Sequence, residues 1–151
     1  MRFKLFLALA FGFLLLLPVA AQDYKTVDDF FEDIPSLNGE LQSNEVILPK
    51  PADFLIKDGN VLVEIILDDG SLKDFYFSIE NSRIVGVSEG KSEKFLYRIS
   101  TNEETANSIL VSEDKAESIL SHYKNKGIKI KAFGFGNKIK FSFAKIFFNI
   151  V

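Results

Sequence analysis

The sequence contains no cysteine and no tryptophan, and it has a single histidine and a single methionine. Without cysteine the chain forms no disulfide, offers no thiolate zinc ligand and has no attachment point for the lipid of a lipoprotein. One histidine also argues against a zinc site built from several imidazoles. Stability must therefore come from buried apolar side chains, and the 16 phenylalanines supply large areas for burial.

The first residues have the composition of a secretory signal. Arg2 and Lys4 precede an unbroken apolar run over residues 5–17, and the leader ends with a small residue, Ala21. The run is shorter than the roughly 20 residues that a membrane-spanning helix needs. We therefore expect a signal peptide over residues 1–21, export from the cytoplasm and a single domain over residues 22–151. An uncleaved signal anchor, with the domain tethered outside the membrane, is the alternative.

The charge balance argues against nucleic acid as a partner. The leader holds two of the 18 Lys and Arg residues and none of the 21 Asp and Glu residues, so the rest of the chain carries 16 cations against 21 anions. A nucleic-acid-binding domain would need a basic patch. The roughly 130 residues that follow the leader are enough for one domain with its own core.

An apolar stripe with helical spacing follows the leader: Val27, Phe30, Phe31 and Ile34. The stripe predicts a short helix with Thr26 as its N-cap. Pro35 is expected to end this helix, because proline cannot donate a backbone hydrogen bond. The polar stretch over residues 36–44 is then expected to be a loop.

Short apolar runs separated by turn residues predict strands at 54–56, 61–67, 72–79, 83–87 and 95–99. The order of runs and short turns favours an antiparallel meander. Asp68–Ser71 has the composition of a hairpin turn and lacks the repeated oxygen ligands of a calcium loop. A clean alternation over residues 128–133 predicts one further strand near the end of the chain.

Two helices are expected between these strand regions. Overlapping capping boxes, Ser100 to Glu103 and Thr101 to Glu104, predict the start of the first. Ser112 is expected to cap the second, and Gly127 to end it in the left-handed conformation. Strands followed by helices indicate an α+β domain whose sheet is covered mainly on one side.

The residues of an enzyme active site are not evident. His122, the sole histidine, lies on the flank of a helix stripe, where a surface or boundary role is expected. The segment Gly134-Phe135-Gly136 lacks the third glycine of a dinucleotide motif, and neither Gly-x-Ser-x-Gly nor a phosphate-binding Gly-Lys-Ser/Thr occurs. We therefore expect a protein that is not an enzyme, with no catalytic residues, metal or cofactor.

The end of the chain is rich in phenylalanine and isoleucine. Six phenylalanines lie between Phe133 and Phe148. They either form an ordinary core or line a cavity for an apolar ligand, and the two look alike in sequence. Periodicity alone leaves residues 138–151 open to either a strand or a helix.

Three segments together resemble a known family. They are the strand with its turn from Lys126 to Gly134, the strand end Tyr97–Ser100 before Glu103 and Glu104, and the hairpin over residues 61–79. In this order they resemble the sterol carrier protein 2 (SCP2) family of lipid-transfer domains, over roughly residues 54–147.

The resemblance implies a five-stranded, mostly antiparallel sheet with helices on one face and a helix at about 138–148. It also implies an apolar cavity between sheet and helices. Five residues would line this cavity: Phe135, Ile139, Phe143, Ile146 and Phe147. The expected function is non-enzymatic binding or carriage of a lipid or other apolar molecule. The alternative is a cell-envelope interaction or structural module with a solid core, which would present an exposed apolar patch to a membrane-surface or protein partner.

Overall fold

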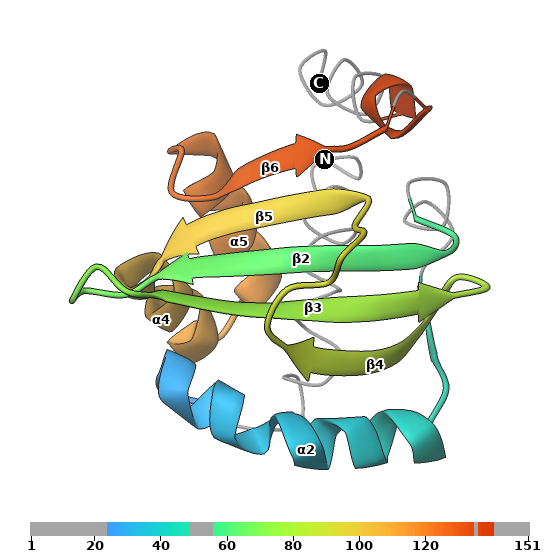
Figure 1. The fold of residues 1–151 in the computed structure, drawn as a ribbon. Coiled ribbons are helices and arrows are strands. Elements are labelled where there is room, and N and C mark those ends of the chain that lie inside the picture. The colour runs from blue at the N-terminus through green and yellow to red at the C-terminus, as the bar shows by residue number, and fades with distance from the viewer. Residues whose placement is uncertain (1–23, 49–55, 135, 141–151) are drawn as a thin grey trace.

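The computed structural model describes residues 24–48, 56–134 and 136–140. Within these ranges the chain forms three helices and six strands (Figure 1). In chain order they are α2 (Val27–Ser43), β1 (Val46–Ile47), β2 (Gly59–Ile66), β3 (Leu72–Glu80), β4 (Arg83–Glu89), β5 (Tyr97–Asn102), α4 (Glu103–Val111), α5 (Lys115–Lys124) and β6 (Lys129–Ala132). Residues 136–140 are also helical.

The six strands form one sheet in the order β1-β4-β3-β2-β5-β6. All neighbouring pairs are antiparallel except β2 and β5, which are parallel. The sheet is thus mostly antiparallel, as expected, but it has one strand more than the five that the SCP2 resemblance implies. The additional strand of this sheet is the two-residue β1, which pairs with the outer edge of β4.

The expected meander holds only for β2, β3 and β4. After β4 the chain crosses the sheet through residues 90–96 and enters β5 beside β2, as Figure 1 shows. Two facts explain why the meander ends there. The outer edge of β4 is already paired with β1, and β5 places Tyr97, Ile99 and Thr101 in register with the buried side of β2.

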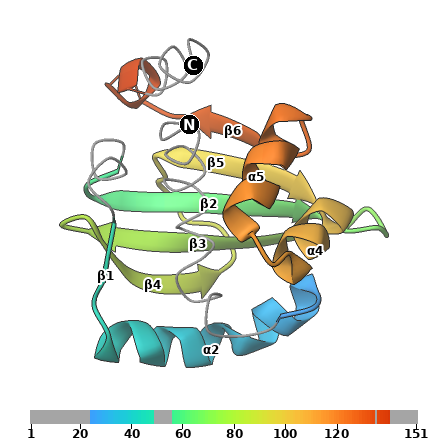
Figure 2. The ribbon, with the colours of Figure 1, turned by 180° about the vertical axis from the view of Figure 1, so that it is seen from behind.

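Helices cover one face of this sheet, as the sequence predicts. In the view from behind, α4 and α5 lie across the sheet and α2 runs along its β4 side (Figure 2). We call this the helix-covered face. On the opposite face, called the open face below, the described chain places the crossover connection over residues 90–96 (Figure 1). The fold is therefore a two-layer α+β arrangement.

The core lies between the helices and the helix-covered face. Alternate residues of β2 and β3 enter it: Val61 lies across the ladder from Phe77 and Val63 from Phe75, and Ile65 is buried on the same side of β2. The ring of Phe75 lies 4.9 Å from that of Phe30 and 5.5 Å from that of Phe31, measured between centroids. Phenylalanine therefore supplies much of the contact between α2 and the sheet.

Helix α2 is longer than expected. It spans 17 residues and contains Pro35, so the predicted stop at Pro35 and the loop over residues 36–44 are wrong. The apolar stripe continues past the proline, because Leu37 and Leu41 are buried at 0% and 8% exposure. Their burial outweighs the hydrogen bond that proline omits. The prediction for Thr26 is confirmed: it caps the helix and forms a capping box with Asp29.

Three predicted ends of the later helices are displaced. Strand β5 continues through Asn102, whose side chain accepts from the Thr105 N–H and caps α4. Asp114 rather than Ser112 caps α5. Lys126, with φ of 64°, takes the left-handed conformation expected at Gly127.

The structure contains two of the predicted turns and lacks one predicted strand at the residue that it describes. Residues Asp68–Ser71 form the β2–β3 hairpin, in which Gly70 has φ of 83°. Asn81 and Ser82 turn the chain between β3 and β4. Ile56 is buried but lies outside any strand, so the predicted strand over 54–56 is wrong there; residues 54 and 55 lie outside the described residues.

Among the described residues, no helix has the length and apolar character needed to cross a membrane. The helical segment over residues 136–140 agrees with the helix that the resemblance implies for the tail. The remainder of that helix, up to residue 148, lies outside the described residues.

Candidate functional site

A small apolar cavity lies between the sheet and the helices. Its volume is about 50 Å³. It is lined by Val27, Phe30, Val63, Ile65, Phe75, Ile99, Thr101, Ala106, Ile109, Leu110 and Ile128. These residues come from α2, β2, β3, β5, α4 and the turn before β6, so the cavity lies between the sheet and the helices.

The floor of the cavity follows from strand alternation. In a strand every second side chain points to the same face, and Val63 lies directly across from Phe75 on one side and Ile99 on the other. Ile65 and Thr101 form the next pair along the ladder. This central part of the sheet therefore presents a continuous apolar surface to the helices.

The roof comes from short side chains of α4 and from the first turns of α2. Ala106 and Ile109 lie one turn apart on α4 and face inward, with exposed fractions of 9% and 6%. Val27 and Phe30 close the side that α2 covers. Because alanine at position 106 stops at Cβ, the helix leaves space above the sheet that a longer side chain would fill.

Among the described residues, the lining offers no free polar group to a ligand. Thr101 is the only one of these lining residues with a side-chain oxygen, and its hydroxyl donates to the Gly127 carbonyl at 2.9 Å. A hydroxyl or carboxylate inside the cavity would therefore be desolvated without a partner, at a cost of about 1–3 kcal/mol or more. The kind of ligand group that matches this lining is therefore a hydrocarbon.

The cavity is too small to hold a long chain in this conformation. An engineered apolar cavity that binds benzene has roughly three times this volume, about 150 Å³. Its apolar lining also keeps such a space dry. A long ligand would need the helices to move away from the sheet.

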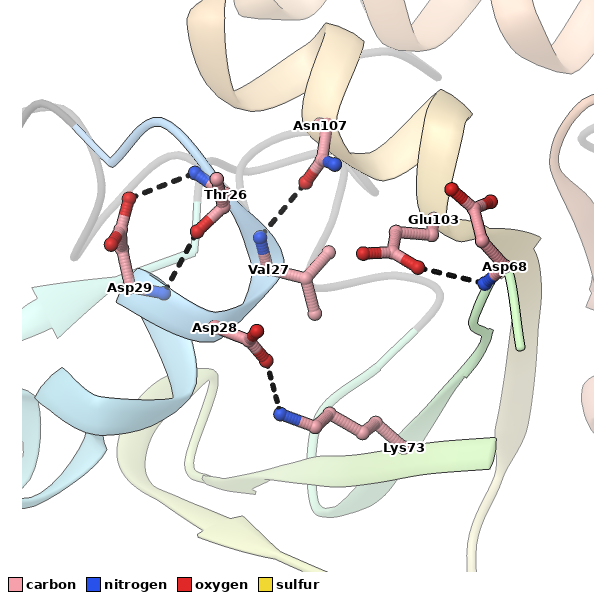
Figure 3. A network of polar contacts seen from close by, with 8 residues as sticks. All are labelled: Thr26, Val27, Asp28, Asp29, Asp68, Lys73, Glu103 and Asn107. Atoms are coloured by element: carbon pink, nitrogen blue, oxygen red, sulfur yellow. Dashed lines mark hydrogen bonds and ion pairs between the residues drawn. The ribbon is translucent and has the colours of Figure 1, made fainter. Parts of the chain in front are cut away.

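A hydrogen bond between Val27 and Asn107, called the polar seam below, joins the two helices that roof the cavity. The Val27 N–H donates to Asn107 Oδ1 of α4 at 2.8 Å, which ties the start of α2 to α4 (Figure 3). The neighbours of this bond, Val27 itself and Ala106, line the cavity. In the same region Glu103 accepts from the Asp68 N–H at 2.7 Å. These bonds border the cavity on the side where α2, α4 and the β2–β3 hairpin meet.

An ion pair also fastens α2 to the sheet beside this seam. Asp28 pairs with Lys73 of β3 (Figure 3). The Lys73 ammonium also lies 5.0 Å from the Phe31 ring centroid. Asp29 accepts from the Lys25 N–H at 3.1 Å and from the Thr26 N–H at 3.0 Å, and these backbone hydrogen bonds lower the pKa of its carboxyl. The start of α2 is thus held by its own cap and by contacts with two other elements.

The five residues predicted to line the cavity remain largely untested. Ile139 is 41% exposed and is absent from the lining. The other four, Phe135, Phe143, Ile146 and Phe147, lie outside the described residues. The lining that the structure does describe belongs to core positions of the strands and helices, and no sequence signal separates a core position beside a cavity from one in a filled core.

A carboxylate pair lies on the open face. Glu64 of β2 and Asp74 of β3 are ladder partners, and Lys91 of the crossover connection approaches both, at 3.6 and 3.8 Å. Arg98 lies 3.6 Å from Glu64. Burial raises the pKa of Asp74, with Lys91 opposing this shift and Glu64 adding to it. The Oδ1 atom of Asp74 is buried without a hydrogen-bond partner.

These groups do not form a metal site. Within the described ranges no three histidine or carboxylate side chains are grouped closely enough to hold a metal ion. His122 lies between the buried and the exposed sides of α5, as expected. It is half-buried, and its Nε2 atom lies 3.2 Å from the Ser108 hydroxyl of α4. Through Lys91, the carboxylate pair connects the crossover connection to β2 and β3.

Fold and site together define a class: a two-layer α+β domain with an apolar cavity between its layers. No protein-family model matches this chain, and no curated protein matches it. The comparison with solved structures, however, returns the family that the sequence resembles.

Three of the similar structures are sterol carrier proteins. Sterol Carrier Protein 2 from Yarrowia lipolytica, in its apo form, is 16% identical with a TM-score of 0.49, over 74% of this chain and 91% of the other. Sterol Carrier Protein 2 Like 2 from Aedes aegypti is 12% identical with a TM-score of 0.49, over 80% and 94%. Palmitated SCP2L2 from Aedes aegypti is 11% identical with a TM-score of 0.48, over 80% and 93%. At this level of similarity they carry no functional conclusion, and the proposal below stands on the cavity itself.

Proposed function

We propose that this protein binds the hydrocarbon part of a lipid or another apolar molecule between its sheet and its helices, without catalysing a reaction. The observation that carries this proposal is the apolar cavity beneath α2 and α4, whose lining holds no free polar group in the part of the chain that the structure describes. A ligand with a polar head would keep that head outside the cavity and place only its chain inside.

Burial alone can supply the affinity. Each methylene group moved from water into an apolar site contributes about 0.8 kcal/mol, so a chain of about ten methylenes gains roughly 8 kcal/mol before costs. Part of this gain is offset by ordering the ligand and by moving the helices to enlarge the cavity. The balance is compatible with reversible binding, which a carrier needs.

The proposal includes export. The cationic start, short apolar run and small residue at Ala21 support removal of the leader outside the cytoplasm. Intact-mass measurement on protein recovered from its own cells would test this, with an N-terminus at Gln22 as the expected result. Full-length protein in the membrane fraction would instead support the signal anchor.

A cavity-filling substitution tests the binding site. Ala106→Leu extends a side chain into the cavity and should weaken binding of a fluorescent fatty acid, cis-parinaric acid, at least tenfold in a titration. Ala132→Leu is the matched control, because Ala132 is also buried, at 6% exposure, but does not line the cavity. Thermal unfolding of both variants establishes that they are folded.

Two outcomes would contradict the proposal. The first is a folded Ala106→Leu protein that binds the probe as tightly as the original chain. The second is an original chain that binds neither the probe nor extracted cellular lipid, detected as a mass adduct under native conditions. The second result would favour the interaction module with a solid core.

A further inference from the structure

The charges of this protein are segregated along the chain. All 21 acidic residues lie at or before Glu117, whereas residues 118–151 contain seven lysines and no acidic residue. The net charge of −3 therefore conceals an acidic portion followed by a purely cationic one. A segregation of this kind indicates a specific charged partner more strongly than the net charge does.

The fold gathers the described part of the cationic segment at one edge of the molecule. We call this the cationic edge; it comprises Lys124, Lys126, Lys129, Lys131, Lys138 and Lys140. These residues lie at the end of α5, in the turn after it, on the outer strand β6 and in the helical segment that follows, so they succeed one another along the β6 edge of the sheet (Figures 1 and 2). All but Lys140 are exposed.

The acidic residues of α2 lie at the opposite edge. They are Asp28, Asp29, Glu32, Asp33 and Glu40. The strand order places β6 at one end of the sheet and the α2 side, with β4 and β1, at the other (Figure 1). With strands about 4.8 Å apart, the outer strands are separated by about 24 Å. This exceeds the screening length of about 8 Å in physiological salt, so the cationic edge acts independently of the acidic one.

The ring of Phe133 lies beside one lysine of this edge and beside Arg98, a neighbouring arginine that is paired with Glu64. The Phe133 ring centroid lies 5.3 Å from the Lys131 ammonium and 5.6 Å from the Arg98 guanidinium. Arg98 and Lys131 are register partners on the open face of β5 and β6. Phe133 also packs edge-on against Phe95, at 4.8 Å between centroids. The edge thus combines exposed positive charge with a half-buried apolar ring.

We propose that the cationic edge docks this protein on a lipid bilayer that carries anionic head groups. Lysines spread over one edge match a plane of phosphates, each contributing attraction near such a surface. Residues 141–151 contain one more lysine, Lys145, and no acidic residue. The rest are mostly apolar, with only Ser142 and Asn149 polar. Lysine interspersed with phenylalanine is the composition that binds at the interface of head groups and acyl chains.

The same composition argues against nucleic acid. Binding to a duplex is dominated by phosphate contacts, with polar side chains at the base edges, and this segment offers mainly apolar side chains between its lysines. The membrane proposal does not depend on the cavity, because the charges lie on the surface. If both proposals hold, the carrier meets the membrane from which its ligand comes.

Vesicle sedimentation of the full chain tests the proposal. Vesicles of phosphatidylcholine alone are compared with vesicles containing one-third phosphatidylglycerol, at low salt and at 0.5 M NaCl. The double variant Lys129→Gln, Lys131→Gln removes two exposed charges of β6. The control Lys25→Gln, Lys57→Gln removes two exposed lysines outside the cationic edge. All three proteins carry the same leader, so any binding by the leader is common to them.

The expected result is binding to the anionic vesicles that is at least tenfold weaker for the β6 variant and nearly unchanged for the control. High salt should abolish the difference. Equal loss in both variants, or equal binding of the original chain to neutral and anionic vesicles, would overturn the proposal. Tighter binding to a random DNA duplex than to anionic vesicles, measured in the same buffer, would overturn the choice of a membrane as partner.

Discussion

Val63 and Val61 are two valines of the same strand and face that differ in what surrounds them. Both are buried, at 2% and 0% exposure, but only Val63 lines the cavity. A methyl group added at Val63 enters free space, whereas one added at Val61 must displace packed neighbours. The pair therefore reports at single-residue resolution whether the cavity is open in solution.

We expect Val63→Ile to raise the free energy of unfolding by up to about 1 kcal/mol, because one more methyl group is buried without strain. Val61→Ile should lower it by about 1 kcal/mol or more, because overpacking a filled core costs that much. Urea unfolding of the two variants measures the difference. Changes of the same sign and size in both would mean that the cavity is filled.

Asp74 should make stability depend on pH in an unusual direction. Because its pKa is raised in the folded protein above the ordinary 3.8, the folded state holds the proton more tightly than the unfolded chain. The ionised carboxylate therefore costs stability at neutral pH, and this cost disappears as the pH falls through the raised pKa towards the unfolded value. Asp69 is the opposite case, since hydrogen bonds from Ser71 lower its pKa.

The test compares Asp74→Asn with Asp69→Asn in unfolding experiments between pH 7 and pH 3. On acidification, the original chain should gain stability relative to Asp74→Asn. It should lose stability relative to Asp69→Asn, because the contribution of Asp69 disappears when its carboxylate is protonated. Parallel pH profiles for the two variants would show that the surroundings of Asp74 do not raise its pKa.

At the scale of elements, α2 tolerates a proline in its ninth position because the helix buries apolar residues on both sides of it. Pro35→Ala restores the N–H that would donate to the Phe31 carbonyl. The unfolded chain regains some freedom, which offsets part of the gain. We expect a net increase of about 2 kcal/mol in the free energy of unfolding. Ser36→Ala, at the exposed next position, is the control and should change stability by a few tenths of a kcal/mol. A less stable Pro35→Ala protein would contradict this account.

The elements also show how far sequence reasoning extends. Local signals located the strands of the β2–β3–β4 hairpins, the Thr26 cap and the helix-covered face, because each depends on residues close together in the chain. The predictions were wrong where a residue far away in the sequence determines where an element begins or ends. Ser100 and Thr101 could cap a helix, but pairing with β2 extends β5 through them, so Asn102 becomes the cap. Strand β5 pairs in parallel with β2 because that edge of β2 is free. The periodicity of the sequence does not show which strand edges are free.

The lining of the cavity also depends on contacts that the sequence pattern does not show. Alternation along β2 identifies Val61, Val63 and Ile65 as core residues, yet only two of the three border the cavity. The empty space depends on how far Ala106 of α4 lies above them, which is a distance between layers. The residues alone therefore leave a filled core and a cavity open. Only the family resemblance implies a cavity between sheet and helices, and neither indicates which core residues line it.

At the scale of the whole molecule, the hydrogen bond from the Val27 N–H to Asn107 is the most direct link between the two roofing helices at the cavity. Asn107→Ala removes the acceptor and leaves a first-turn N–H of α2 without its partner, at a cost of about 1–3 kcal/mol. With the seam weakened, α2 and α4 should separate more often. Since a long ligand requires such separation, cis-parinaric acid should then bind and dissociate several-fold faster in stopped-flow fluorescence.

The variant Asn107→Asp distinguishes a gate from a general loss of stability. Its carboxylate keeps an oxygen acceptor for the Val27 N–H, and a negative charge is favourable at the start of α2. Ligand exchange in Asn107→Asp should therefore remain close to that of the original chain. If instead Asn107→Ala and the original chain exchange ligand at the same rate while Asn107→Ala is less stable, the seam is structural and the ligand enters elsewhere. A faster rate in Asn107→Ala alone would identify the α2–α4 seam as the route through which an apolar chain reaches the core.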